Sequence, residues 1–312
     1  MINTSVCIGD IMSNQPSSDN FELGVRYELG QGVEKDPYKA AKYYALAVDE
    51  GNPAAECALG EMYMGGNGVP KDHVKGIELF TRSASKGFSK SMFNMGMVFW
   101  AGAGVPQDYV EARKWFLKAA DAGEVGAFVE LGMLYINGYG VEQDISEAGK
   151  WLLKAAEAGD ALSQYKVGYM YEGGAGMTKD RDKAFQWYKK AAEQDIPDAQ
   201  FKVASVLMED SLQNEDEAIT WYTKAANLGL LPAMVNLGII RYTRAEYADA
   251  LKWFQTASFK NDPDAQFYLG RLYIEGKGVE KDIDKGVTWL RVSADNGNKA
   301  AKDIIARVEG HN

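Results

Sequence analysis

Residues 129–140 read V-E-L-G-M-L-Y-I-N-G-Y-G, and close variants of this stretch recur along the whole chain of 312 residues. The glycine of its L-G pair, Gly132, marks one position of the repeat. The equivalent residues are Gly24, Gly60, Gly96, Gly132, Gly168, Ala204, Gly238 and Gly270. Five successive spacings are 36 residues, and the last two are 34 and 32. Because such a period is typical of stacked repeats, we expect eight repeats over residues 21–298 rather than two globular domains.

Each copy predicts two helices. Around Gly132 the apolar residues Leu131, Leu134 and Tyr135 have helical spacing. Gly138 and the second loop glycine, two residues later, predict a left-handed helix stop and a tight loop. Asp144 then stands where the second helix should begin, and its carboxylate can accept the free backbone N–H groups of the first turn. The chain is therefore expected to be all-α, with a helix-turn-helix unit in each repeat.

The second helix of each repeat carries the pattern K-A-x-x-W-aromatic, followed by an Ala pair. Six of the seven tryptophans share one repeat position: Trp115, Trp151, Trp187, Trp221, Trp253 and Trp289. A cofactor site would not recur at every repeat, so these tryptophans are expected to fill the core between neighbouring helices. Such units bury their apolar faces only by stacking, which predicts a solenoid.

The full pattern, A-x-x-x-L-G-x-x-Y-x-x-G-x-G-V-x-x-D-x-x-K-A-x-x-W-Y-x-K-A-A-x-x-G, resembles the Sel-1-like repeat, a relative of the tetratricopeptide repeat. The resemblance implies a right-handed α/α superhelical solenoid that serves as a protein-binding scaffold. Members act as adaptors, as bacterial host-interaction factors and as immunity proteins. We therefore expect a non-enzymatic scaffold, without a cofactor, that binds a partner protein in its concave groove. An immunity protein that neutralises a secreted toxin is the narrower alternative.

The helical wheel predicts where a partner would bind. At about 100° per residue, the positions one and four after the repeat glycine lie away from the core arc, yet many of them are apolar. In tetratricopeptide-type stacks the first helices line the concave surface. The predicted groove residues are Met64, Met97, Trp100, Met133, Ile136, Tyr169, Met208, Ile239 and Tyr242. The alternative is that the neighbouring helix pair covers these positions, above all those four after the glycine, so that they complete the core.

Charge and composition limit the partners. The chain has 34 Lys and Arg against 44 Asp and Glu, a net charge of −10, which argues against nucleic acid and anionic membrane surfaces. The sequence contains no run of 18 apolar residues, so we expect no membrane span. The first Lys or Arg is Arg26, so the basic segment that begins a signal peptide is missing. The chain has only two cysteines, Cys7 and Cys57, and we expect both to be free thiols in a reducing compartment. We therefore expect a cytoplasmic chain, and a monomer is favoured.

Patterns of catalytic sites are incomplete. Ser83 and Lys86 fit S-x-x-K, and residues 18–20 read S-D-N, but no K-T-G occurs, so a β-lactamase-like hydrolase is the less favoured alternative. The two histidines, His73 and His311, have no His or Cys at metal-ligand spacing, which predicts no metal site. We expect no enzyme.

The ends of the chain and two of the repeats depart from the pattern. Residues 1–20 are expected to be a polar tail, and residues 299–312 a capping helix and tail that buries Ala301 and Ile305. The sixth copy replaces the Gly-x-Gly loop by E-D-S-L-Q-N (209–214), and the seventh by T-R-A-E-Y (243–247). The curvature of the solenoid is expected to change there.

Overall fold

The computed structural model describes residues 19–210 and 214–309, which form seventeen α-helices and no strand. The prediction of an all-α chain of helix pairs is thus confirmed. The helices are α1 (Asp19–Leu29), α2 (Pro37–Asp49), α3 (Pro53–Gly65), α4 (His73–Ser85), α5 (Ser89–Ala101), α6 (Tyr109–Asp121), α7 (Val125–Asn137), α8 (Ile145–Glu157), α9 (Ala161–Gly173), α10 (Arg181–Glu193), α11 (Pro197–Asp210), α12 (Glu215–Asn227), α13 (Leu231–Thr243), α14 (Tyr247–Ser258), α15 (Pro263–Glu275), α16 (Ile283–Asp295) and α17 (Lys299–Glu309).

The helix boundaries have the predicted chemical causes. Asp144 accepts a hydrogen bond from the backbone N–H of Glu147 at 3.0 Å, and Asp108 does the same for Glu111. Gly138 ends α7 with φ of 70° and donates its N–H to the carbonyl of Leu134. A left-handed residue at this point satisfies a carbonyl that the helix would leave free, and glycine adopts it without a Cβ clash.

The repeat glycine allows the two helices of a repeat to approach closely. A Cβ at Gly96 would lie 2.4 Å from the ring of Phe116, which is fully buried. The same position in the other second helices holds Tyr44, Phe80, Leu152, Tyr188, Tyr222, Phe254 and Leu290, all buried. The residue that fills the core is therefore the one after the tryptophan. The prediction that the tryptophans fill the core holds only in part. Trp221 is buried, and the other five are half-buried, four of them at the edge of a core cluster: Trp115, Trp151, Trp253 and Trp289. The fifth, Trp187, is covered by Lys190 at 4.0 Å.

The second glycine of each loop makes a contact between repeats. A Cβ at Gly140 would lie 2.6 Å from the carbonyl carbon of Tyr109, at the start of the second helix of the preceding repeat. Gly68, Gly104, Gly176 and Gly278 lie equally close to the corresponding helix starts. A Cβ at Gly32, in the first repeat, would have only Arg26 within 4 Å among the described residues, at 3.6 Å. From the second repeat onward, the second loop glycine therefore lets its loop pack closely on the repeat before it.

The two atypical repeats form ion pairs with the second helix of the repeat before them. Arg181, the first residue of α10, donates to Glu209 of α11 at 3.0 Å. Arg244, in the shortened loop after α13, pairs with Glu215 at 2.9 Å and with Asp216 at 3.4 Å at the start of α12. The predicted change of curvature at these repeats stays a prediction.

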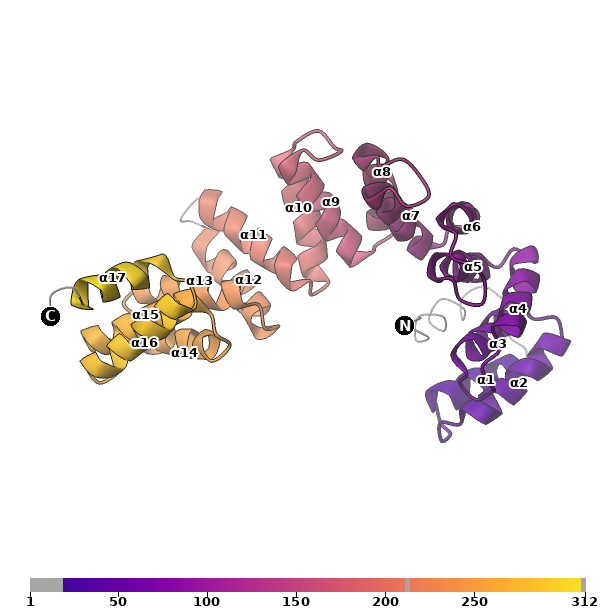
Figure 1. The fold of residues 1–312 in the computed structure, drawn as a ribbon, viewed down its shortest axis with the longest axis horizontal. Helices are drawn as coiled ribbons and strands as arrows, with labels where there is room; N and C mark the ends of the chain where they lie inside the picture. The colour runs from indigo at the N-terminus through magenta and orange to yellow at the C-terminus, as the bar shows by residue number, and fades with distance from the viewer. Residues whose placement is uncertain (1–18, 211–213, 310–312) are drawn as a thin grey trace. The chain divides into compact units, whose positions relative to one another are not determined.

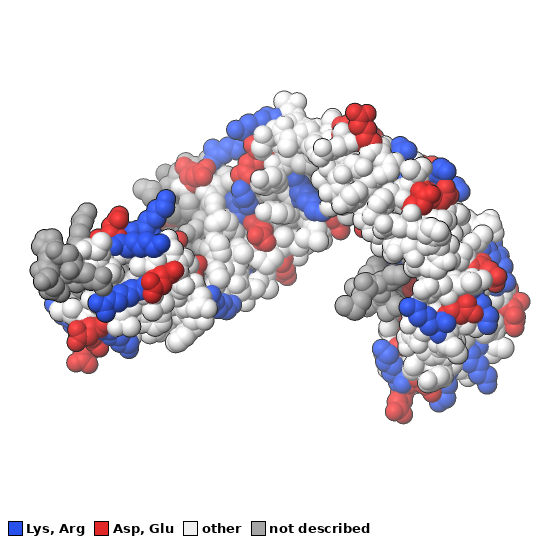
Figure 2. Space-filling view, in the orientation of Figure 1, with Lys and Arg blue, Asp and Glu red and all other residues white. Residues whose placement is uncertain are grey.

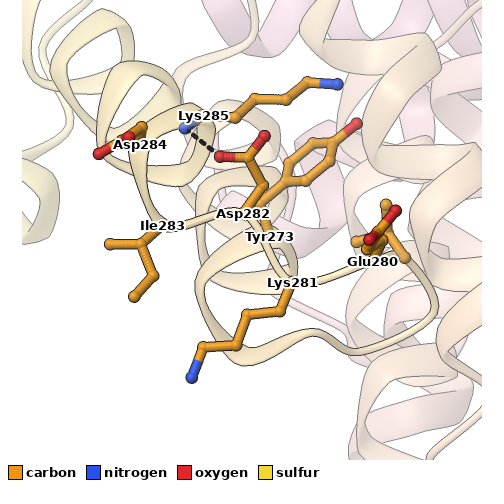
Figure 3. A pocket seen from close by; sticks show the side chains of 8 residues that line it. Tyr273, Glu280, Lys281, Asp282, Ile283, Asp284 and Lys285 are labelled. Carbon is orange, nitrogen blue, oxygen red and sulfur yellow. Dashed lines mark hydrogen bonds between the residues drawn. The ribbon is translucent and has the colours of Figure 1, made fainter.

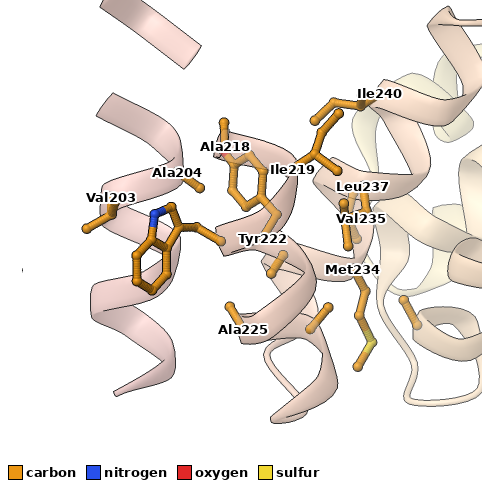
Figure 4. Packing of buried hydrophobic residues seen from close by; sticks show 14 of the residues in the cluster. Val203, Ala204, Ala218, Ile219, Tyr222, Ala225, Met234, Val235, Leu237 and Ile240 are labelled. Atoms are coloured by element: carbon orange, nitrogen blue, oxygen red, sulfur yellow. The ribbon is translucent and has the colours of Figure 1, made fainter. Parts of the chain in front are cut away.

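The chain divides into two compact units, which we call the N-terminal unit (Met1–Ser163 with Ala175–Thr178) and the C-terminal unit (Gln164–Gly174 with Lys179–Asn312). Within the N-terminal unit, α1, α3, α5 and α7 follow one side and α2, α4, α6 and α8 the other (Figure 1). The C-terminal unit contains an extended core in which Tyr222 of α12 lies between α11 and α13 (Figure 4). Ala301 and Ile305 of α17 are buried as predicted.

Most of the predicted N-terminal tail, residues 1–18, lies outside the described residues. Cys7, Ser18 of the S-D-N pattern and His311 lie outside them as well. No helix in the described part is long and apolar enough to span a bilayer.

Candidate interaction surface

Four predicted groove residues of the N-terminal unit lie on α5 and α7, the first helices of the third and fourth repeats. Met97, Trp100, Met133 and Ile136 are all half-buried, so part of each side chain remains open to solvent. The charged side chains of this unit lie mainly elsewhere in the view of Figure 2, which leaves an uncharged surface over α5 and α7. Half-buried Met and Trp side chains on such a surface are typical anchors of protein interfaces.

Met64 is the exception among the predicted residues. It is only 6% exposed, and it packs with Phe80 and Met95 in a core cluster. Its thioether also fills the space beside Gly76, where a Cβ would lie 2.7 Å from the sulfur. The second repeat thus completes its core with the residue four after the glycine, and Met64 is not part of the surface.

Trp100 is fixed at the edge of this surface by other aromatic rings. Its ring centroid lies 5.0 Å from that of Tyr109 and 5.5 Å from that of Tyr139, both edge-on, and the two tyrosines stack at 5.0 Å. Gln107 donates a hydrogen bond to the Trp100 carbonyl at 2.7 Å, and this closes the end of α5. Tyr139 stands between the two loop glycines, so the loop contact described above also places this ring.

We call Met97, Trp100, Met133 and Ile136 the apolar face.

The predicted residues of the C-terminal unit differ in exposure. Tyr169 is 58% exposed, whereas Met208, Ile239 and Tyr242 are half-buried and pack against the core cluster. These three residues therefore complete the core in part, as the alternative interpretation of the sequence predicted.

Tyr242 is the centre of a charged cluster that sequence reasoning did not find. Its hydroxyl donates to Glu275 at 2.6 Å and accepts from Arg271 at 3.1 Å. Lys277 pairs with Glu275 at 2.8 Å. Partial burial alone would raise the pKa of Glu275, but hydrogen bonds from Lys277, Tyr242 and Arg271 outweigh it and hold the pKa at about 2. The carboxylate is therefore charged throughout the physiological range.

A second polar cluster joins α9, α10 and α11. Glu172 accepts hydrogen bonds from Lys202 at 2.8 Å and from the Tyr188 hydroxyl at 2.7 Å. Burial favours a raised pKa for Glu172, but these two donors outweigh it, so the pKa is lowered. The same carboxylate, together with burial, raises the pKa of Tyr188 well above its ordinary value. These three residues come from different positions of two repeats, and only the stacking of the repeats brings them together.

The residues considered for catalysis are used structurally. Ser83 is fully buried, donates to the carbonyl of Pro53 at 2.7 Å and accepts from Ser91 at 2.7 Å. Lys86 binds Glu56 at 2.7 Å and the Gly51 carbonyl at 2.9 Å. The two residues of the S-x-x-K pattern therefore have separate partners within the fold.

The buried thiol Cys57 lies beside Glu61 and Asn94. Its burial, with a smaller contribution from the Glu61 charge, raises its pKa far above the ordinary value, so it remains a protonated thiol. His73 is the first residue of α4 and packs against Gly104. Within the described ranges, no three His, Cys, Asp or Glu residues are grouped as metal ligands.

A wide pocket at the loop before α16 is lined by Tyr273 and residues 279–285 (Figure 3). Asp282 accepts from the Lys285 backbone N–H at 2.9 Å, and the Lys285 ammonium lies 4.2 Å over the Tyr273 ring. The equivalent Lys–Tyr contacts recur at Lys39 over Tyr27 and Lys75 over Tyr63. The arrangement therefore belongs to the repeat itself and gives no special binding site.

Stacked helix pairs with loop glycines and capping aspartates define an α-solenoid repeat protein. Seven segments match the Sel1 repeat family: 18–52, 53–88, 89–124, 129–160, 161–196, 197–230 and 263–298. The chain therefore belongs to this family, as the resemblance in the sequence had implied. The segment 231–262, which carries the shortened loop, is not among those matched, although its helices α13 and α14 pack as a pair.

Solved structures of the same family are similar to this chain. A protective antigen of uropathogenic Escherichia coli strains with an SLR fold is 34% identical, over 93% of this chain and 71% of that one, with a TM-score of 0.55. A Sel1 repeat protein of Oxalobacter formigenes is 33% identical, over 67% of this chain and 86% of that one, with a TM-score of 0.59.

Among curated proteins, the rat DAP3-binding cell death enhancer 1 is 32% identical over 83 residues. That match spans 26% of this chain and 16% of the rat protein, about two repeats in length.

Proposed function

We propose that this protein is a non-enzymatic scaffold that binds a partner protein through the apolar face of α5 and α7. Sel1 repeat proteins are in general protein-interaction scaffolds. The observation that carries the proposal is that Met97, Trp100, Met133 and Ile136 remain partly exposed at positions where a solvated helix would carry polar residues. Methionine adapts to the shape of a partner, and a tryptophan fixed by other rings loses little side-chain entropy on binding.

The proposal is tested with paired substitutions in the full chain. Replacing both Met97 and Met133 with Gln keeps the length of each side chain and removes its apolar character. Val74→Gln is the matched control, because Val74 is 64% exposed on α4, outside the face. Each protein is immobilised, and partners from the native lysate are quantified by mass spectrometry.

We expect at least one protein that is retained by the wild type and by Val74→Gln, and that is depleted by more than tenfold with the double variant. Equal recovery by a folded double variant would contradict the proposed surface. The identity of that protein separates the two narrower roles: a secreted toxin would make the chain an immunity protein, whereas a signalling or secretion component would make it an adaptor.

A further inference from the structure

A cavity of about 250 Å³ lies between α10 and α11 in the C-terminal unit, next to the loop that follows α9. Its lining combines apolar side chains with charged ones. The apolar part includes Phe185, Phe201 and Val206. The charged part consists of Glu172, Lys179, Arg181, Lys202 and Glu209. Blue and red side chains are interleaved over these helices in Figure 2.

The charges of the cavity do not cancel. Glu172 is neutralised by Lys202 at 2.8 Å, and Glu209 by Arg181 at 3.0 Å. Lys179 is exposed and has no hydrogen bond or ion pair at contact distance with any residue that the structure describes; its charge acts on Glu172 only from a distance, where it helps to lower the pKa of that carboxyl. The cavity therefore has three cations against two carboxylates, on a chain whose net charge is −10. One positive charge is left to bind a ligand.

The positions of the paired charges are fixed by the fold. Glu172 also accepts from Tyr188, whose side chain is 1% exposed, so the carboxylate that holds Lys202 is itself held by a core residue. Lys202 lies 5.8 Å over the Tyr188 ring. A site whose charged groups are already ordered needs little rearrangement to bind a ligand.

We propose that this cavity binds one acidic side chain of the partner protein, next to an apolar residue that contacts Phe201 and Val206. The inference rests on the proposed function, because it assigns a contact to the partner of that scaffold. The partner carboxylate would accept a hydrogen bond from the Lys179 ammonium group, and hydrogen bonds between charged groups are about twice as strong as neutral ones. A basic side chain would find both carboxylates already paired. The apolar lining requires that the residue beside the acid be aliphatic or aromatic.

The test uses two capped peptides and the full chain. N-acetyl-Leu-Glu-Leu amide carries the proposed chemistry, and N-acetyl-Leu-Gln-Leu amide is its neutral isostere. Each peptide is titrated into isotopically labelled protein, and the backbone amide shifts are followed. We expect the Glu peptide to bind with a dissociation constant in the millimolar range, with shifts confined to α10, α11 and the loop before α10. The Gln peptide should bind at least tenfold more weakly.

Lys179→Gln is the informative variant, because Lys179 is exposed and acts on the fold only through its long-range attraction to Glu172, so the melting temperature should change little. Lys189→Gln removes the same charge from α10 outside the cavity. We expect Lys179→Gln to raise the dissociation constant of the Glu peptide about tenfold and Lys189→Gln to leave it unchanged. Binding of neither peptide, equal binding of both, or equal effects of the two variants would overturn the proposal.

These outcomes are independent of the test of the proposed function. Partner capture that depends on Met97 and Met133 but not on Lys179 would remove the cavity from the interface and leave the scaffold function intact.

Discussion

At the scale of single residues, the repeat glycines carry the fold. A Cβ on Gly96 would lie 2.4 Å from the ring of Phe116, which is fully buried. We expect Gly96→Ala to lower the free energy of unfolding by about 1–3 kcal/mol, as overpacked cores do, and urea unfolding measures it. Gly65→Ala is the control, because a Cβ there meets nothing within 4 Å. That change should be neutral or stabilise by up to ~1 kcal/mol, since alanine is the better helix former. A destabilisation of equal size in both variants would refute the packing role.

The pKa of Glu275 gives a second prediction for a single residue. Because the folded pKa of about 2 is below the ordinary value of 4.5, the carboxylate stabilises the fold fully above pH 4.5. That contribution falls as the pH decreases towards 2. Since the side chain is 27% exposed, we expect it to be at most about 1 kcal/mol. The difference in unfolding free energy between wild type and Glu275→Gln should therefore shrink between pH 4.5 and pH 2. A difference that stays constant between pH 4.5 and pH 2 would count against the cluster.

The sequence predicted the repeat glycines, the capping aspartates and the helix pairs, because each of these follows from contacts within one repeat. It did not distinguish the tryptophan from the residue after it. The two are about 100° apart on the helix, and either could face the core. The structure places the second residue, such as Phe116, on the glycine, and Lys118 covers Trp115 at 4.1 Å. Met64 was misplaced for a different reason: besides Phe80 of its own repeat it packs against Met95 of the next one, a contact that the helical wheel of one helix does not show.

At the scale of elements, the contacts between repeats differ in kind. The loop of Gly140 lies on the backbone of Tyr109, whereas Arg244 holds α12 by two ion pairs. We expect Gly140→Ala, at a φ of 64°, to destabilise by about 2 kcal/mol or more at any salt concentration. Arg244→Ala should destabilise less than Gly140→Ala, and its effect should shrink as NaCl rises from 50 mM to 1 M, because salt screens exposed ion pairs. Urea unfolding at the two salt concentrations checks both. A salt-independent loss in Arg244→Ala would mean that the arginine acts by packing.

The surface residues of the C-terminal unit show why the candidate site could be predicted only in part. Apolar residues one and four after each repeat glycine can be found from the helical wheel, which is how the apolar face was found. Lys179, Lys202 and Glu172 lie in a loop and in two different first helices, and no period relates them. Charged residues of this kind come together only when one repeat stacks on the next.

At the scale of the whole molecule, stability should spread through nearest neighbours, because each helix packs mainly on those before and after it in the chain. Gly238→Ala would place a Cβ 2.4 Å from Phe254 in the C-terminal unit, and Gly60→Ala would place one 2.8 Å from Phe80 in the N-terminal unit. Hydrogen–deuterium exchange of the intact chain follows each helix separately. We expect Gly238→Ala to speed exchange in α13 to α16 by tenfold or more and to leave α1 to α4 unchanged. Gly60→Ala should give the converse pattern: faster exchange in α2 to α5, and unchanged exchange in α13 to α16. Faster exchange along the entire chain in either variant would instead show that the chain unfolds as one cooperative body, in which a change in one repeat is felt in all.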